Sequence, residues 1–309
     1  MRQNLILKPL RGIIPPVITP LKNQDTLDGE GLIRLVEHLI SGGVHGLFIL
    51  GTTGEGPSLS YHLRYEITER VCDQVNKRVP VLVGITDTAL TESVKLAEKA
   101  ESFGADAVVA APPYYFTSNQ SELTDYFHEL AERSPLPLFL YNMPSHTKVN
   151  IAEKAVLNLS SHDNIIGLKD SSANLVYFQK VVQLMENHPE FSLLVGPEEL
   201  LMQSVLSGAH GGVNGGANLF PEIYVKMYNA AVNRDFEQMK QIQTIIIQVS
   251  SSLYGIGSSP GSYLQGVKSA LSVLGICSDV IALPCRSHSR EEKETVKKAL
   301  EALNKAVSL

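Results

Sequence analysis

The chain of 309 residues lacks a surplus of positive charge, because 26 Lys and Arg residues stand against 32 Asp and Glu residues, giving a net charge of −6. It also has no basic stripe, and both absences argue against a nucleic-acid partner. No apolar run approaches the roughly 18 residues that a membrane-spanning helix needs. The apolar run at residues 5–7 is too short for a signal peptide. We therefore expect a cytoplasmic protein with no membrane partner.

The chain is also poor in cysteine. Cys72, Cys277 and Cys285 are an odd set of thiols with no CxxC pair and no metal-ligand spacing, which predicts free thiols in a reducing compartment. The histidines are scattered, and only His146 and His210 fall near the ends of predicted strands. We therefore expect neither a metal site nor any other cofactor.

What the chain does have is a regular alternation of short Val-, Ile- and Leu-rich runs with amphipathic segments. The runs are too continuously apolar for half-exposed strands, which indicates parallel strands buried on both faces. A composition of 44% hydrophobic and 19% charged residues fits a globular protein with a sizeable core. The predicted strands are residues 12–18, 46–50, 81–84, 106–110, 138–141, 165–169, 191–196 and 211–213.

Helices are predicted between these strands because apolar residues recur there at helical spacing, as at Leu96, Ala100 and Phe103. Gly104 and Gly208 have the positions of helix-ending glycines. Eight strand–helix units predict a closed (β/α)8 barrel, also called a TIM barrel. The alternative is an open doubly wound sheet, which would need a glycine loop at its switch point that we do not find. The predicted helices are residues 29–41, 61–76, 91–103, 121–132, 151–159, 173–187 and 199–207.

The pattern changes after the eighth predicted strand. Residues 221–232, 235–251, 261–274 and 290–306 read as helices with no strands between them. No linker rich in proline, serine or charge marks an independent domain. We therefore predict two parts: a catalytic barrel over residues 1–221 and a C-terminal helical layer, residues 222–309, packed on it.

Lys169 is the most informative single residue, since it closes the apolar run 164–168 and precedes Asp170. In a barrel of this kind the chemistry lies where strands end. Burial at such a position disfavours the ammonium form, and a neutral amine is what attacks a ketone to form a Schiff base. The alternative is an ordinary lysine at a strand end, paired with Asp170.

Two other strand ends carry suitable groups. Residues 51–56 place glycines around Thr52 and Thr53, so the backbone can bend and present amides and hydroxyls to a carboxylate; the alternative is a plain tight turn. Tyr141 ends the strand before that of Lys169, and adjacent parallel strands bring their ends together. Its phenol can therefore carry protons to and from an imine, although a lone tyrosine there can also be packing.

The seventh and eighth strand ends are less specific. Glu198 and Glu199 either stabilise the first turn of a helix through its dipole or accept hydrogen bonds from sugar hydroxyls. The glycine-rich residues 211–218 are compatible with a phosphate site and equally with close packing of backbone against substrate.

Four motifs in order resemble one family, that of dihydrodipicolinate synthase and N-acetylneuraminate lyase. Their spacing matches as well, with 26 residues from Tyr115 to Tyr141 (141 − 115) and 28 from Tyr141 to Lys169 (169 − 141). The resemblance covers nearly the whole chain, including the C-terminal helices. The motifs are Gly51-Thr52-Thr53-Gly54-Glu55, Tyr114-Tyr115, Tyr141-Asn142-Met143-Pro144 and Gly167-Leu168-Lys169-Asp170.

The resemblance implies a class I, metal-free enzyme in which Lys169 forms a Schiff base with pyruvate or another 2-keto acid. It implies that Tyr141 shuttles the proton while a C–C bond is made or broken, and that Thr52 and Thr53 hold the carboxylate. Tyr115 matches the family tyrosine that reaches into a neighbouring subunit's site, so a homodimer or homotetramer is expected.

The fifth strand end departs from the synthase pattern. His146 and Lys148 stand where synthases usually have arginine and glycine, and a histidine is a poor substitute for a bidentate arginine clamp. A second interpretation is that His146 is a buried histidine with no ligand role.

Other positions are similar to those of the lyases. Glu198 and Glu199 align with the acidic pair that binds the hydroxylated tail of the sugar in sialic acid lyases. Ser171 falls where lyases and sugar-acid aldolases have a hydroxyl residue. Gly215, by contrast, stands where the sialate lyases usually have serine.

We therefore expect reversible cleavage of a 2-keto-3-deoxy sugar acid, or of N-acetylneuraminate, to pyruvate and an aldehyde. The alternatives are 4-hydroxy-tetrahydrodipicolinate synthase, which condenses pyruvate with aspartate semialdehyde, a dehydratase or decarboxylase with the same imine, and a non-catalytic ligand-sensing barrel. The expected catalytic residues are Lys169, Tyr141, Thr52 and Tyr115, and the expected substrate-binding residues are Thr52, Thr53, Gly54, His146, Ser171, Glu198, Glu199, Val213 and Gly215.

Overall fold

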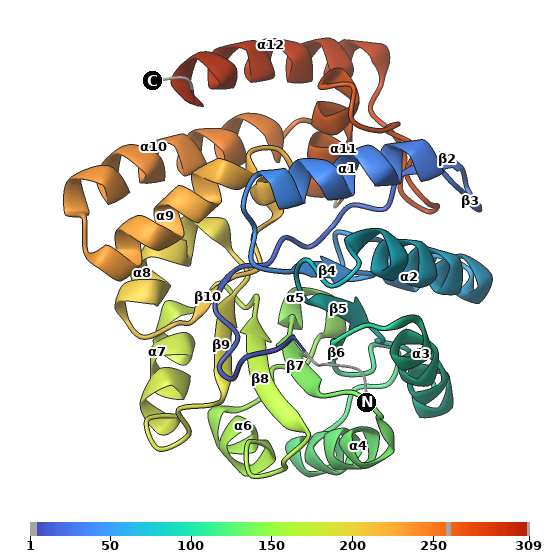
Figure 1. Ribbon diagram of the computed structural model, residues 1–309, viewed down its shortest axis with the longest axis vertical. Helices are drawn as coiled ribbons and strands as arrows, with labels where there is room; N and C mark the ends of the chain where they lie inside the picture. Colours follow the sequence, from blue (N-terminus) through green and yellow to red (C-terminus); the bar gives the residue numbers. More distant parts are fainter. Residues whose placement is uncertain (1–4, 258–260, 308–309) are drawn as a thin grey trace.

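A computed structural model describes residues 5–257 and 261–307 of the chain. Its main sheet has eight strands, all parallel, in the spatial order β1-β10-β9-β8-β7-β6-β5-β4 (Figure 1). The strands are β1 (Gly12–Ile13), β4 (Leu47–Ile49), β5 (Val81–Gly84), β6 (Ala107–Ala110), β7 (Leu138–Asn142), β8 (Ile165–Asp170), β9 (Ser192–Val195) and β10 (Gly211–Gly212).

The sheet closes on itself through the segment that follows β1. Pro16 and Phe48 form a parallel bridge, in which the Val17 amide donates to the Phe48 carbonyl (2.8 Å) and the Phe48 amide to the Pro15 carbonyl (3.0 Å). This closure confirms the predicted barrel and excludes the open sheet. The predicted strand 12–18 is regular only at its start, because prolines have no N–H to donate to a ladder.

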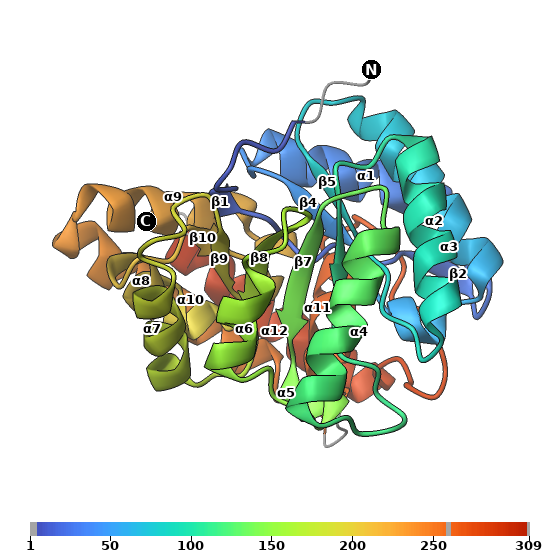
Figure 2. The same ribbon diagram turned by 90° about the horizontal axis from the view of Figure 1, so that it is seen from below.

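Helices surround the strands on the outside (Figure 2). Most predicted helices are present with ends shifted by a few residues, and the left-handed Gly104 (φ 95°) ends α3 as expected. The predicted helix 173–187 begins later, since the Asn174 side chain caps it. The helices are α1 (Gly29–Ser41), α2 (Tyr61–Val75), α3 (Leu90–Phe103), α4 (Gln120–Arg133), α6 (Glu153–Leu159), α7 (Leu175–Leu184) and α8 (Leu201–Leu206).

Four further helices gather beside the barrel, above it in the view of Figure 1. They are α9 (Pro221–Asn233), α10 (Phe236–Leu253), α11 (Ser262–Val273) and α12 (Arg290–Val307). We propose that this layer departs from the barrel at the start of α9. None of the helices in the described parts of the chain is both long and apolar enough to cross a membrane.

Short elements that the sequence patterns did not predict lie between the main ones. The strands β2 (Leu21–Asn23) and β3 (Thr26–Leu27) form a small antiparallel hairpin. Single turns of helix follow four of the strands and are η1 (Gly56–Ser58), α5 (Pro144–Thr147), η2 (Glu198–Leu200) and η3 (Gly215–Asn218). Because these turns follow the carboxyl ends of strands, they shape the rim where the site lies.

Two apolar cores hold the barrel together. One lies between strands and helices and includes Leu140 and Leu168. The other fills the barrel interior and includes Phe48, Phe139 and Tyr141. The division follows from the alternation of side chains along a strand, which sends neighbouring residues to opposite faces.

Candidate active site

Lys169 reaches the barrel interior because β8 is irregular. Ile165 is opposite Leu138, but Gly167, not Ile166, is opposite Phe139, so the register shifts by one residue. Ile165 packs in the core between the strands and the helices. If side chains alternated strictly from Ile165, the side chain of Lys169 would point to that outer face of the sheet as well. An irregularity of this kind re-aims the side chains that follow it.

The amine of Lys169 lies among aromatic rings, and the residue as a whole is only 5% exposed. Its Nζ is 3.9 Å from the centroid of the Tyr141 ring and 4.9 Å from that of Phe48. Burial lowers the pKa of Lys169, and this effect outweighs Tyr141 and Asp170, which raise it. A lowered pKa favours the neutral amine, which is the form of lysine that can act as a nucleophile.

The carboxylate of Asp170 accepts hydrogen bonds from two neighbouring side chains. Asn142 donates to one of its oxygens (2.8 Å) and the Ser172 hydroxyl to the other (2.9 Å). Asp170 therefore helps to fix the ends of β7 and β8 to each other, which stabilises the strand pair that carries the site.

Tyr141 is directly opposite Lys169 in the ladder between β7 and β8. Its hydroxyl lies 3.2 Å from Oγ1 of Thr52. Amine, phenol and threonine hydroxyl thus lie next to one another, as required for a path that moves protons near the amine.

Thr52 and Thr53 lie on a tightly held segment, residues 50–56, which we call the threonine turn. Gly54 is required within it, since a Cβ there would lie 2.9 Å from both the Leu50 amide nitrogen and the Val17 carbonyl oxygen. The Gly54 carbonyl accepts a hydrogen bond from the Thr19 hydroxyl (2.6 Å).

The far end of the threonine turn is attached to the C-terminal layer. Glu55 has a left-handed backbone (φ 58°) and a buried side chain. Its carboxylate forms an ion pair with Lys268 of α11 and accepts a hydrogen bond from the Ala282 amide (2.7 Å). Lys268 also donates to the Val280 carbonyl (2.5 Å). The turn is thereby held from both the barrel and the helical layer.

These groups line one cavity of about 930 Å³. Two of the residues predicted for the site are not part of its lining: Gly54, which lies within the threonine turn, and Tyr115, which is 77% exposed on the loop between β6 and α4. The predicted residues that do line the cavity are Lys169, Tyr141, Thr52, Thr53, His146, Ser171, Glu198, Glu199, Val213 and Gly215.

His146 is exposed on the rim rather than buried. Its Nδ1 lies 3.0 Å from the Ser145 hydroxyl. Partial desolvation, together with the nearby charges of Lys148 and Lys169, lowers the pKa of His146. A neutral imidazole there can exchange hydrogen bonds with a ligand but supplies little positive charge.

Glu198 forms a structural part of the wall. It is 3% exposed, and its carboxylate accepts hydrogen bonds from the Tyr224 hydroxyl (2.6 Å), the Tyr254 hydroxyl (2.7 Å) and the Gly216 amide (2.8 Å). Burial raises the pKa of Glu198 to about 7 despite these bonds. Glu199 is less buried.

Sequence reasoning missed the aromatic part of this wall. Tyr254 and Tyr263 line the cavity from the C-terminal layer, and their rings pack edge to face with centroids 4.8 Å apart. The rule that chemistry lies at strand ends gives no reason to look among these helices. The glycine at position 215 was a usable signal, since a missing side chain at a strand end leaves room for a residue from elsewhere.

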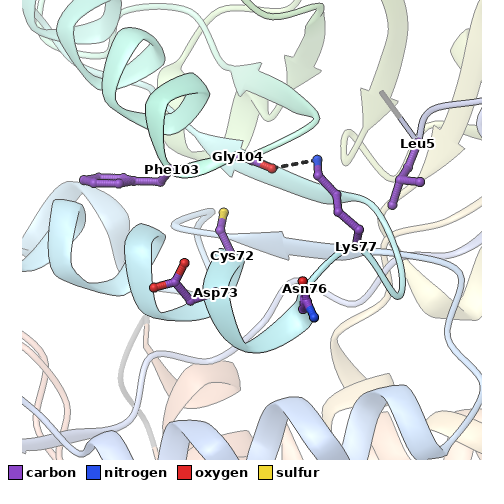
Figure 3. A pocket seen from close by; sticks show the side chains of 7 residues that line it. All are labelled: Leu5, Cys72, Asp73, Asn76, Lys77, Phe103 and Gly104. Carbon is purple, nitrogen blue, oxygen red and sulfur yellow. Dashed lines mark hydrogen bonds between the residues drawn. The ribbon is translucent and has the colours of Figure 1, made fainter. Parts of the chain in front are cut away.

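A second hollow lies where α2 and α3 end, and Figure 3 shows the side chains around it. It measures about 350 Å³ and is lined by the C-terminal ends of α2 and α3, which precede the strands. Lys77 there donates to the Gly104 carbonyl (2.8 Å) and pairs with Asp106 (2.6 Å). Its charge is thus already matched, and the larger cavity remains the candidate site.

Metal ligands are not grouped in the described ranges, where no set of three or more His, Cys, Asp and Glu side chains is placed to hold an ion. Cys72, Cys277 and Cys285 form no disulfide with one another.

Comparison with known proteins agrees with the fold. The model of the dihydrodipicolinate synthetase family matches residues 9–303. The 4-hydroxy-tetrahydrodipicolinate synthase of Methanocaldococcus jannaschii is 33% identical over 95% of this chain and 98% of its own length. A probable 2-dehydro-3-deoxy-D-pentonate aldolase, YjhH of Escherichia coli, is 30% identical over 93% of this chain and 94% of its own.

Two solved structures show the same architecture. The dihydrodipicolinate synthase of Bacteroides thetaiotaomicron is 55% identical with a TM-score of 0.94, over 96% of this chain and all (100%) of that one. YagE of Escherichia coli, solved in complex with pyruvate, is 30% identical with a TM-score of 0.91, over 96% of this chain and 99% of its own. The chain therefore belongs to the dihydrodipicolinate synthetase family, whose members are class I lyases and aldolases that form a Schiff base between a lysine and pyruvate.

Proposed function

We propose that the protein reversibly cleaves a 2-keto-3-deoxy sugar acid to pyruvate and an aldehyde, with Lys169 as the Schiff-base residue. The observation that carries this proposal is the buried amine of Lys169, which lies over the Tyr141 ring. A lysine held in this way loses its charge more easily than one in water and can attack a carbonyl carbon.

The first half of the reaction forms the imine. Thr52 and Thr53 hold the substrate carboxylate through their hydroxyls and the amides of the threonine turn. The neutral amine of Lys169 adds to the C2 carbonyl, and Tyr141 and Thr52 carry the protons that allow the oxygen to leave as water. The product is an imine that gains a proton and becomes an electron sink.

The second half breaks the carbon–carbon bond. Tyr141 removes the proton of the C4 hydroxyl, and the electrons of the C3–C4 bond move toward the imine nitrogen while the C4 oxygen becomes the carbonyl of the departing aldehyde. The enamine that remains takes a proton at C3, and water hydrolyses the imine to release pyruvate and restore the amine.

The substrate is proposed to be larger than pyruvate. The cavity of about 930 Å³ leaves ample room beyond a three-carbon acid, and His146, Ser171 and Glu199 supply hydrogen-bonding groups along that space. The pentonate aldolase among the relatives also supports a sugar acid. A second candidate is 4-hydroxy-tetrahydrodipicolinate synthase, favoured by the names of several relatives, while His146 in place of an arginine argues against it.

A homo-oligomer belongs to the proposal. Tyr115 is 77% and Phe116 80% exposed, with ring centroids 5.1 Å apart, and such a pair is suited to insertion into a neighbouring subunit. We propose that Tyr115 completes the site of a second copy in a dimer or tetramer, and that the protein is cytoplasmic.

The test offers 2-keto-3-deoxygluconate and N-acetylneuraminate in parallel and measures pyruvate release, while a separate assay follows condensation of pyruvate with aspartate semialdehyde. Release from the first compound, faster than from the second, is the expected result. Condensation without release from either acid would replace the proposal by the synthase. If borohydride traps no pyruvate adduct on the enzyme, the Schiff-base role of Lys169 is refuted.

A further inference from the structure

Tyr263 reaches the threonine turn from outside the barrel. It belongs to α11 of the C-terminal layer, and its hydroxyl lies 3.1 Å from Oγ1 of Thr53. Both residues line the cavity that contains Lys169. A phenol from the helical layer is therefore in hydrogen-bonding contact with a hydroxyl proposed to hold the substrate carboxylate.

The position of this phenol is built into the opposite wall. A Cβ added to Gly215 would lie 1.7 Å from the Tyr263 oxygen, so the hydroxyl occupies the space that a side chain at that strand end would take. The Tyr254 ring packs edge to face against the Tyr263 ring, and Tyr254 is itself held by Glu198 (2.7 Å). The orientation of Tyr263 is thus fixed by its neighbours rather than left to solvent.

The direction of the hydrogen bond follows from counting protons. A carboxylate can only accept, and a threonine hydroxyl has a single proton to donate. When Thr53 donates that proton to a bound carboxylate, its oxygen can still accept, and Tyr263 is the adjacent donor. Burial raises the pKa of Tyr263 above its usual value, an effect that the charge of Glu198 reinforces, so the phenol keeps its proton.

We propose that Tyr263 is a positioning residue for the carboxylate of the 2-keto acid, acting by donating its phenol proton to Thr53 and thereby directing the Thr53 hydroxyl proton toward the substrate. The inference rests on the proposed function, since it requires a carboxylate at the threonine turn. It assigns to the C-terminal layer a part in binding that no strand end supplies.

The test measures imine formation directly. Full-length protein is incubated with increasing pyruvate and reduced with borohydride, and the adduct is quantified by mass, which gives the half-saturating pyruvate concentration. We expect Tyr263→Phe, which keeps the ring, to raise this concentration about five- to tenfold, the effect of one lost hydrogen bond. The kcat for cleavage should change little, because the carboxylate is held equally in ground and transition states.

Two further variants separate positioning from general damage. Thr53→Val should raise the half-saturating pyruvate concentration. In the double variant with Tyr263→Phe this concentration should rise little further, because the phenol has no hydroxyl to direct once Thr53 is replaced. Tyr228→Phe, which removes a phenol oxygen from α9 outside the cavity lining, is the matched control and should bind pyruvate as the parent does.

Each outcome has one meaning. Unchanged half-saturation in Tyr263→Phe, or full additivity with Thr53→Val, overturns the positioning role while the parent protein still forms its adduct, so the proposed function survives. An absence of adduct in the parent protein overturns the proposed function and the inference together.

Discussion

Two walls of the cavity are assembled differently. The wall with Lys169 and Tyr141 comes from neighbouring strands of one ladder, in which the two residues are directly opposite each other. The wall with Thr53 joins the barrel to the helical layer, through the Tyr263 hydroxyl and the Glu55–Lys268 ion pair. Reactive groups thus lie on two adjacent strands of the sheet, whereas the groups that orient the substrate depend on contacts between distant segments.

The strongest way to test the strand wall is to remove its amine. Lys169→Ala should reduce cleavage by about four or more orders of magnitude, since Lys148, the other lysine in the described lining of the cavity, is exposed and its amine donates to the Ser145 carbonyl. Pyruvate release and borohydride adduct mass measure this, with the thermal midpoint as the check on folding. Measurable adduct formation by the folded variant would contradict the assignment of Lys169.

Substitutions in the wall that joins the helical layer to the barrel should lower the stability of the protein. Lys268→Met leaves the buried Glu55 carboxylate without its cation, and we expect a loss of about 3–5 kcal/mol in the free energy of unfolding. Urea unfolding measures it. Lys95→Met, which breaks an exposed ion pair with Glu92, is the control and should have no measurable effect. An equally small effect of Lys268→Met would show that the ion pair does not hold the two parts together.

The same wall should give the protein a pH-dependent stability through Glu198. Its pKa is raised to about 7 from 4.5, so the folded state binds the proton more tightly than the unfolded chain. The resulting stability is present below about pH 4.5 and is lost as pH rises through 7, by up to about 3 kcal/mol. Unfolding curves between pH 5 and 8 compare the parent with Glu198→Gln, in which this slope should flatten; equal slopes would count against the shift.

The proton path of the strand wall can be tested at Tyr141. Tyr141→Phe keeps the ring beside Lys169 but removes the hydroxyl that contacts Thr52 (3.2 Å). We expect kcat to fall about a hundredfold with a small change in KM, which is the usual cost of losing a general acid or base. Steady-state kinetics decide, and a variant with a raised KM and an unchanged kcat would assign the phenol to binding instead.

The smallest expected effect follows from the smallest change of side chain. In Gly215→Ala the new methyl would lie 1.7 Å from the Tyr263 hydroxyl oxygen, so the Tyr263 ring must shift against Tyr254, with which it packs edge to face. The Tyr263 hydroxyl then leaves Thr53, and half-saturation by pyruvate should rise severalfold, as in Tyr263→Phe. Titration of the borohydride adduct and a thermal melt test this. Unchanged pyruvate binding would mean that binding does not depend on the position of the Tyr263 hydroxyl.

The contrast between the walls also explains what the sequence could predict. Lys169 and Tyr141 are 28 residues apart (169 − 141) on consecutive strands, so reading strand after strand brings them together. Thr53 and Tyr263 are separated by 210 residues, and no local pattern announces that a helix of the last part folds over the second strand end.

Local irregularities of the strands could not be predicted from the sequence either. The register shift at Ile166 decides which way Lys169 points, and nothing in the apolar run signals it. Pro15 and Pro16, by contrast, were visible as a reason to shorten the first predicted strand. The role proposed for Tyr115 requires a second copy of the chain, which a single sequence does not contain.

The bridge between Pro16 and Phe48 links the folding of the chain to the reactivity of the Lys169 amine. Phe48 completes the ring of strands, and its side chain is also one of the two aromatic surfaces around the Lys169 amine. In the unfolded chain neither ring is held beside that amine, which is in water and carries its ordinary positive charge. The unfolded chain is therefore no more reactive toward carbonyl compounds than any lysine-containing peptide, and the urea-unfolded protein should be trapped by pyruvate and borohydride no faster than such a peptide.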